Sequence, residues 1–248
     1  MATPKTTPDA PAAAATAAAV TPSRAYMQVI SVDEETGEVI EKPRFKYLSG
    51  HPRQVRFDAK AGNFNVNGDI PLGKTLSFIP AGLRIFSDNI LNMGRKLWAE
   101  LYFMDEAGRT CAVLFHGYSV ENLQKLNASL FYDDLKLTDV VLTVEPIKKQ
   151  TEKPDEAGVM KKANYFIADF KYTAADPAEV EARRQFVEDF ELYREETLTG
   201  AADMRIVQGY RIPEGYQLPE QQAAKQLASP SAAELATGAA TLAELEAK

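Results

Sequence analysis

The stretch RKLWAELYFMDEAGRTCAVLFHGYS, residues 95–119, decides the fold because it carries the strongest structural pattern in the chain. Apolar and polar residues alternate on both sides of the turn EAG, which predicts two antiparallel strands joined as a β-hairpin. Since successive side chains point to opposite sides of a strand, the pattern also divides the hairpin into two faces. The face predicted to line the core carries Leu97, Ala99, Leu101, Phe103, Cys111, Val113 and Phe115, and the outward face carries Lys96, Trp98, Glu100, Tyr102, His116 and Tyr118.

Further strand patterns precede this hairpin. Alternation around the turns EETG and KAG predicts hairpins at residues 28–41 and 54–68. Residues 73–88, GKTLSFIPAGLRIFSD, have a longer strand pattern that Pro80-Ala81-Gly82 interrupts. Proline and glycine inside a strand indicate a bulge, an edge or a bend, so we expect one bent strand here. The same alternation directs Arg84 and Phe86 outward.

A helix and two more strands follow the central hairpin. Residues 119–134 change to a helical period, with Ser119 as the expected N-cap. Strands are predicted at 138–149 and 164–174, with the polar loop 150–163 between them. From residue 74 onward the predicted order is therefore β-β-β-α-β-β. The apolar face of the helix consists of Val120, Leu123, Leu126 and Leu130.

A second helix is predicted at residues 178–196, with Pro177 at its start. Its apolar stripe has helical spacing. Such a stripe packs on the parent domain, or it contacts a protein partner or a second copy in a homo-oligomer, and both readings stay open. Residues 177–220 as a whole are interpreted as this helix and an extended segment. The stripe consists of Val180, Phe186, Val187, Phe190 and Tyr193.

The two ends of the chain differ in composition from its middle. Residues 1–24 are mainly Ala, Thr and Pro, and residues 221–248 are rich in Ala and Glu, so we expect flexible tails. Residues 1–24 lack the Leu-rich centre of a signal peptide, and no segment has the roughly 20 apolar residues that span a bilayer. We expect a soluble, cytoplasmic protein of a bacterial or phage-infected cell, with no membrane partner. Its main domain is predicted at 74–176, after a hairpin extension at 25–73.

The residue inventory gives little support to a catalytic or metal site. The chain has one cysteine, Cys111, within the apolar run CAVLF, and two histidines, His51 and His116, which exclude a disulfide framework and a Cys/His zinc site. Neither a G-x-S-x-G motif nor a His/Asp arrangement around a serine is present. We expect no enzymatic activity, no metal and no cofactor.

The segment GDIPLGKT, residues 68–75, matches the phosphate-loop pattern G-x-x-x-x-G-K-[ST] letter for letter. A phosphate loop needs a buried parallel strand before it and a helix after it, so that amide groups point at one anion. The preceding residues alternate with polar ones, and Pro80 would interrupt the helix after five residues. We interpret the match as a polar turn that leads into the bent strand, with Lys74 as a surface base.

The charge of the chain is unevenly distributed, with a net value of −7. Residues 1–43 carry 3 basic and 6 acidic groups, and residues 177–248 carry 7 and 13, so the flanks are acidic. Residues 44–103 instead hold 9 basic groups against 4 acidic ones, a local excess of +5, whereas residues 104–176 hold 9 against 12. This asymmetry favours an anionic ligand for the basic part.

Aromatic rings beside basic side chains on one sheet face are typical of proteins that stack unpaired nucleic-acid bases. The alternative is that the N-terminal hairpin or the 178–196 helix covers this face and turns Trp98 and Tyr102 into a second core. On the first interpretation the nucleic-acid-binding residues are Lys96, Trp98, Tyr102, Arg84, Phe86 and Tyr118.

The order of elements over residues 74–174 resembles the OB-fold, a five-stranded antiparallel Greek-key barrel with a ligand face on strands 2 and 3. The bent segment FIPAGLRIF matches the long first strand of that family, and SVENLQKLNASLF matches the helix between its strands 3 and 4. The resemblance implies a mainly β protein with helices, built on an OB-like barrel. It departs from bacterial single-strand-binding proteins at its end, TLAELEAK, which is not their acidic, aromatic-tipped partner motif.

Two functions follow from these patterns. The first is non-enzymatic binding of single-stranded DNA or RNA in replication or recombination, by base stacking and backbone electrostatics, with further protein partners at the C-terminal helix or tail. The second is a structural or assembly role in a virion or multiprotein complex, in which the hairpins and the 178–196 helix make subunit contacts.

Overall fold

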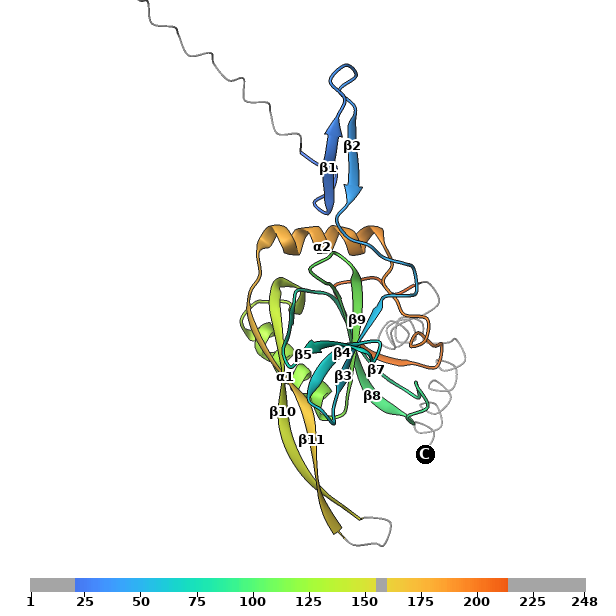
Figure 1. Cartoon of the computed structure of the whole chain (residues 1–248), viewed down its shortest axis with the longest axis vertical. Coiled ribbons are helices and arrows are strands. Elements are labelled where there is room, and N and C mark those ends of the chain that lie inside the picture. The colour runs from blue at the N-terminus through green and yellow to red at the C-terminus, as the bar shows by residue number, and fades with distance from the viewer. Residues whose placement is uncertain (1–20, 155–159, 214–248) are drawn as a thin grey trace, which may run out of the picture.

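The computed structural model of the protein describes residues 21–154 and 160–213, which form a mainly β structure with two α-helices (Figure 1). The helices are α1 (Tyr118–Tyr132) and α2 (Pro177–Asp189), and η1 (Leu137–Asp139) is a turn of 3-10 helix. The strands are β1 (Met27–Val32), β2 (Val39–Pro43), β3 (Arg53–Asp58), β4 (Asn63–Val66), β5 (Ile70–Gly73), β6 (Leu76–Phe78), β7 (Pro80–Asp88), β8 (Lys96–Met104), β9 (Thr110–His116), β10 (Val140–Pro154), β11 (Met160–Ala174) and β12 (Asp203–Gln208).

The described strands form three sheets. The largest has the order β12-β7-β8-β9-β3-β4-β5, a smaller one has the order β11-β10-β6, and β1 pairs only with β2. The pair β3–β9 is parallel and the other pairs are antiparallel. Only Ile79 separates β6 from β7, and the register with β8 shifts between Pro80 and Gly82. The bent strand predicted at this place is therefore confirmed, and its bend takes the chain from one sheet to the other.

The sheets do not close into the predicted barrel. The outer edge of β9 is occupied by β3, from the N-terminal part of the chain, rather than by β11. The outer edge of β11 makes single hydrogen bonds instead of pairing with a strand. Phe166 N–H donates to the Ala59 carbonyl at 2.7 Å, and Ala168 N–H donates to Ser119 Oγ at 2.9 Å. Residues 53–73, predicted as part of an extension, thus belong to the main sheet, because their backbone groups satisfy an edge that the barrel strands leave open.

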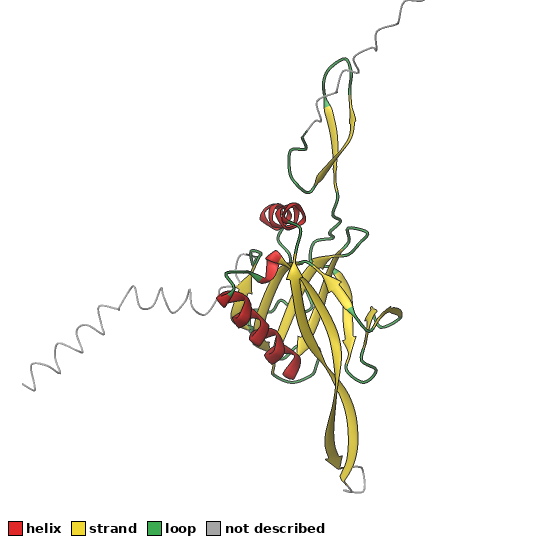
Figure 2. Cartoon of the chain, turned by 90° about the vertical axis from the view of Figure 1, so that its left-hand side faces the viewer, coloured by secondary structure: helices red, strands yellow, loops and turns green. Residues whose placement is uncertain are grey.

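The main core lies between the two larger sheets and α1, which runs along one side of them (Figure 2). The predicted core face of the central hairpin is confirmed, since Leu101 and Val113 are fully buried there. A second layer of apolar residues fills the opposite face of β7 and β8, beneath α2 and the segments that follow α2 and β12. Gly82 permits this layer, because an added Cβ would lie 2.4 Å from the ring of Tyr210.

Several predicted boundaries are wrong. Helix α1 begins one residue before the expected cap: Gly117 occupies the N-cap, and the Ser119 hydroxyl accepts from β11 instead. Most of the polar loop 150–163 is strand, because β10 and β11 continue pairing as far as Pro154 and Met160. Helix α2 ends at Asp189, before the predicted residue 196, and the backbone becomes extended at Phe190. Strand β12 was predicted only as extended chain.

The predicted tails lie largely outside the described residues. Residues 1–20 and 214–248 are not described, so those expectations remain predictions. Residues 21–24 are described and are held in place: Ser23 N–H donates to Glu41 at 2.8 Å, and Arg24 pairs with Asp189 at 2.7 Å. Ser23 and Arg24, which were predicted to lie in the N-terminal tail, therefore contact the rest of the described structure.

Two hairpins project from opposite ends of the body, and both views show the same arrangement (Figures 1 and 2). The β1–β2 hairpin extends beyond α2, and the outer halves of β10 and β11 extend away from the other end. We call the second projection the arm, residues 147–154 and 160–167. Among the described residues, no helix is long and apolar enough to cross a membrane.

Candidate nucleic-acid interface

Four of the six predicted binding residues are not on the surface. Trp98, Tyr102, Phe86 and Arg84 are each at most 1% exposed. They do lie on the face opposite the main core, as the alternation predicted, but α2 and the segments that follow α2 and β12 cover that face. The prediction that these four form an open stacking platform is therefore wrong, and the alternative of a second core is what the fold contains.

The covered face is organised around a buried ion pair. Arg84 Nη2 lies 2.6 Å from Glu100 Oε2, and Tyr102 donates its hydroxyl to the same oxygen at 2.8 Å. Thr197 donates to Glu100 Oε1 at 3.0 Å, so a residue far along the chain completes the network. The guanidinium also lies over the ring of Phe86, 4.2 Å from its centre. These contacts fix the covering segment on β7 and β8.

Burial and the Glu100 carboxylate determine the direction in which the pKa values of Arg84 and Tyr102 are shifted. Burial alone would lower the pKa of Arg84, but the adjacent Glu100 carboxylate more than offsets this and raises that pKa above its ordinary value. Burial and then the same carboxylate raise the pKa of Tyr102. Both residues therefore keep their protons, Tyr102 is a neutral donor, and the network is a structural element rather than an acid–base site.

The other two predicted residues, Lys96 and Tyr118, stay accessible and lie near each other. The register pairs Trp98 with His116, so Lys96 lies across from the end of β9, where Tyr118 follows. Tyr118 is 59% exposed and Lys96 is half-buried. These two residues mark the part of the predicted surface that a ligand can reach.

Tyr118 lines a small cleft of about 140 Å³ at the base of the arm, which we call the arm-base cleft. The cleft lies where the end of β9 and the start of α1 meet β11. Its exposed or half-exposed rings come from different segments of the chain, so the fold gathers them. Its wall includes His116, Tyr118, Tyr165, Phe166 and Ile167.

His116 connects the cleft to the covered face. Its ring packs edge-on against Trp98 with 5.2 Å between ring centres, while the residue remains exposed on its other side. Burial, followed by the charge of Lys96, lowers the pKa of His116 from its ordinary value. A neutral imidazole at pH 7 is an aromatic ring that a base can stack on, and Lys96 supplies the cation beside it.

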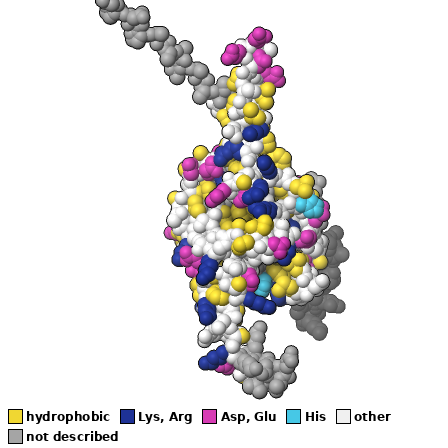
Figure 3. Space-filling view, in the orientation of Figure 1, with side chains coloured by type: hydrophobic (Ala, Val, Ile, Leu, Met, Phe, Trp, Pro, Cys, Tyr) yellow, Lys and Arg dark blue, Asp and Glu magenta, His cyan; other side chains and the backbone are white. Residues whose placement is uncertain are grey.

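The arm adds cations next to this cleft. Lys149 pairs directly with Tyr165 across the two strands, so both side chains lie on one face of the arm. Lys148 and Lys162 lie on the other face, and all three lysines are exposed. Figure 3 shows Lys and Arg groups on the arm and along the same side of the body. The arrangement offers aromatic rings at the base and cations along the projection.

Sequence reasoning missed Tyr165, Lys149 and His116 as members of this site. Tyr165 was placed on the last predicted strand, and Lys149 was placed at the end of the strand before it, next to the predicted loop. The signal that could have found them is the run of lysines at 148–162 next to the aromatic pair Tyr165-Phe166. Only the three-dimensional pairing of β10 with β11 shows that these residues share a surface with Tyr118.

A larger groove of about 670 Å³ opens between β6 and the β3–β5 end of the main sheet. Arg53 and Arg109 stand at its rim, and both pair with Asp105, at 3.2 and 2.7 Å. Cys111 lies at its floor, where burial raises the pKa of the thiol to about 12. The thiol is therefore protonated and unsuited to act as a nucleophile. The floor rings Phe78 and Phe103 stack on each other and are buried, so they offer no face to a base.

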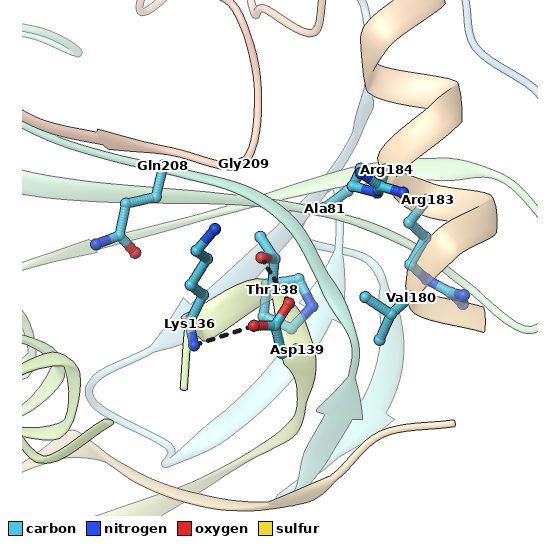
Figure 4. Close-up of a pocket in the computed structure, with 10 residues that line it drawn as sticks. Ala81, Lys136, Thr138, Asp139, Val180, Arg183, Arg184, Gln208 and Gly209 are labelled. Carbon is cyan, nitrogen blue, oxygen red and sulfur yellow. Dashed lines mark hydrogen bonds between the residues drawn. The ribbon is translucent and has the colours of Figure 1, made fainter. Parts of the chain in front are cut away.

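A third cavity, of about 380 Å³, lies between α2, η1, β7 and β12 (Figure 4). Its cations are Lys136, Arg183 and Arg184. The two arginines already pair with acidic residues of their own helix, at Glu179 and Glu181. Since Asp139 also lines it, little positive charge is left over for an anionic ligand. It is a weaker candidate than the arm-base cleft.

The segment GDIPLGKT forms a short edge strand, β5, and the turn into β6. Its Lys74 is exposed, and strand β6 follows where a phosphate loop has a helix. The predicted polar turn before a bent strand is thus found, with β5 added. Among the residues that the structure describes, no group of three or more His, Cys, Asp or Glu side chains could hold a metal ion.

Comparisons with known proteins identify no relative of this chain. No protein-family model matches the chain, and neither a curated protein nor a solved structure is significantly similar to it.

Proposed function

We propose that the protein binds single-stranded DNA or RNA, without catalysis, through the arm-base cleft and the inner part of the arm. The observation that carries the proposal is the meeting of Tyr118, His116 and Tyr165 in one cleft, with Lys96 near His116 and Lys149 paired with Tyr165. Aromatic rings provide faces for unstacked bases, and the lysines follow the phosphates. The interaction requires neither a metal nor a cofactor.

The arrangement of strands supports an OB-like reading of the core. The bent β6–β7 unit pairs with β8 on one side and with β10 on the other, β8 pairs with β9, and α1 lies between β9 and β10. This is the strand order of the Greek key in OB-folds, whose members often bind single strands. In this chain the outer face of β7 and β8 is covered, so the proposed contact moves from that face to the arm and its base.

The size of the cleft limits what it can hold. At about 140 Å³ it accepts part of one base, so further nucleotides would lie along the exposed arm. Duplex DNA offers no free base to the cleft, because its bases are already stacked on each other. We therefore expect single strands to bind more tightly than duplex of the same sequence.

The test is the fluorescence anisotropy of a labelled oligo-dT titrated with the full chain at low salt. We expect Tyr165→Ala and Tyr118→Ala each to lose about 1–3 kcal/mol of binding free energy, the usual contribution of a stacked base. The logarithm of the affinity should fall with the logarithm of salt concentration by about 0.7 per phosphate contacted.

The matched control is Tyr132→Ala, since Tyr132 is 84% exposed at the other end of α1. It removes an equally accessible ring outside the cleft, and we expect unchanged binding. Equal losses in all three tyrosine variants, or no binding by the wild-type protein at low salt, would exclude the arm-base cleft as the site.

A further inference from the structure

The β1–β2 hairpin is built as a contact surface that the described chain itself does not use. It is a separate two-stranded sheet, and neither of its outer edges pairs with another strand. Ile30, Val32 and Ile40 on it are 55%, 41% and 53% exposed. A two-stranded hairpin is marginally stable on its own in water, and open edges with aliphatic side chains tend to pair with another chain.

The base of this hairpin is held firmly on α2. Tyr26 packs edge-on against Phe186 at 5.4 Å, and its hydroxyl donates to Asp189 at 2.7 Å. Ala25 N–H donates to Gln185 at 2.7 Å. The hairpin is therefore a fixed projection rather than a loose end, and it presents its outer half in a defined direction.

The tip of the hairpin is strongly acidic. Residues 33–41 contain five acidic groups and no basic one. Two backbone amides, of Thr36 and Glu35, donate to the Asp33 carboxylate and lower its pKa, so this carboxylate stays ionised. Acidic side chains gather at this end of the molecule in Figure 3.

The arm at the opposite end has the complementary character. Its described residues, 147–154 and 160–167, contain five lysines against one acidic residue. Ile147 and Met160 are 37% and 58% exposed on it, and beyond Val144 its strand β10 pairs only with β11. Both projections thus combine open edges and exposed aliphatic groups, but their charges are opposite.

We propose that copies of this protein associate head to tail, with the acidic β1–β2 hairpin of one copy on the basic arm of the next. Like charge disfavours the two symmetric arrangements, because hairpin on hairpin would join acidic tips and arm on arm would join lysines. Opposite charges favour the mixed contact. The two surfaces lie at opposite ends of the molecule, so the contact is heterologous. It leaves one free surface on each terminal copy and can therefore repeat along a chain of molecules.

The lysines used by this contact differ from those of the proposed function. The contact employs Lys148 and Lys162, on the face of the arm opposite Lys149 and Tyr165, although Lys148 is paired with Phe166 in the wall of the cleft. Association can therefore occur with or without nucleic acid. A single strand of nucleic acid bound in the arm-base clefts of successive copies would then be covered by proteins that contact one another.

The test is sedimentation velocity of the full chain without nucleic acid, over a series of concentrations at low salt. We expect the weight-average sedimentation coefficient of the wild-type protein to rise with concentration. The hairpin variant Glu34→Lys/Glu35→Lys and the arm variant Lys148→Glu/Lys162→Glu should each associate more weakly by about tenfold or more, because each places like charges together.

Mixing the two variants gives the decisive result, because a basic hairpin then meets an acidic arm. We expect the mixture to recover the association that each variant lacks alone. The control Glu106→Lys/Glu121→Lys changes the net charge as the hairpin variant does, but at exposed positions outside both surfaces, and should associate like the wild type. A wild-type protein that stays monomeric, an arm variant that associates normally, or a mixture without recovery would overturn the proposal.

Discussion

Arg84 and Glu100 form an ion pair at 2.6 Å whose two side chains are 1% and 0% exposed. The pair lies on the face of β7 and β8 that the sequence predicted as outward, and Thr197 from the covering segment bonds to both partners. Through Thr197, this buried pair holds the segment after α2 on the central sheet. The covering layer keeps the aromatic residues beside the pair from contacting a ligand.

Removing one partner of this pair should destabilise the protein strongly. We expect Glu100→Ala to cost about 3–5 kcal/mol of unfolding free energy, because it leaves the Arg84 guanidinium buried without its counter-charge. The double variant Arg84→Met/Glu100→Leu should lose less, since it leaves no buried charge. Urea unfolding measures these values.

Glu145→Ala, which breaks the exposed pair with Lys171, is the control and should leave the midpoint unchanged. Equal midpoints for Glu100→Ala and Glu145→Ala would contradict the structural role.

The only tryptophan should behave as a core residue. Trp98 is 1% exposed and donates its indole N–H to the Asp88 carbonyl at 3.0 Å. We expect Trp98→Ala to lose about 3–5 kcal/mol of stability, as large-to-small substitutions in cores do. Collisional quenching by acrylamide should be weak in the native protein and strong in urea. Efficient quenching of the native protein would show that the covering layer is open.

The single cysteine should be chemically silent in the folded protein. Burial, with a smaller contribution from Asp105, raises the pKa of Cys111 to about 12, and the residue is 1% exposed. Alkylation needs the thiolate and access to it. We expect iodoacetamide to react slowly with native protein at pH 8 and rapidly in denaturant. Similar rates in both conditions would mean that the groove beside Cys111 is accessible.

The stability of the protein should depend on pH through His116. Because burial and the charge of Lys96 lower its pKa in the folded protein, the unfolded chain binds the proton more readily. The neutral ring therefore contributes fully to the stability of the folded protein above the unfolded pKa of about 6.5. This contribution is lost as the pH falls from there through the lower pKa of the folded state. We expect the stability difference between wild type and His116→Gln to shrink on acidification, measured by urea unfolding at each pH. A difference that is constant or grows would contradict the sign.

The central hairpin could be predicted from the sequence because its information is local. Alternation over residues 95–119 determines which side chains share a face, and the register of Trp98 with His116 follows from the short turn. Alternation cannot show whether a second layer covers the outward face. Here that layer comes from distant segments, including Tyr26, Phe186 and Met204, whose own patterns are short.

The open barrel and the arm could not be predicted from the sequence, because both arise from pairing between segments that are distant along the chain. The parallel contact of β3 with β9 joins residues more than fifty positions apart, and no local pattern marks it. The outer part of the arm was interpreted as a loop because the segment QTEKPDEAGVMKKA is polar and lacks the alternation of a half-buried strand. Of the residues proposed to contact nucleic acid, Lys96 and Tyr118 could be named from the sequence, whereas Tyr165 and Lys149 required the strand pairing.

Photocrosslinking locates the nucleic acid most directly. A single strand carrying 5-iodouracil is irradiated with the full chain at low salt, and the crosslinked peptides are identified by mass spectrometry. We predict crosslinks at Tyr118, His116 or Tyr165, whose rings line the arm-base cleft, and none at the buried Trp98 or Tyr102. Crosslinks confined to other surfaces, such as the groove beside Arg53 and Arg109, or no crosslink under conditions where a known single-strand-binding protein reacts, would contradict a nucleic-acid site at the base of the arm.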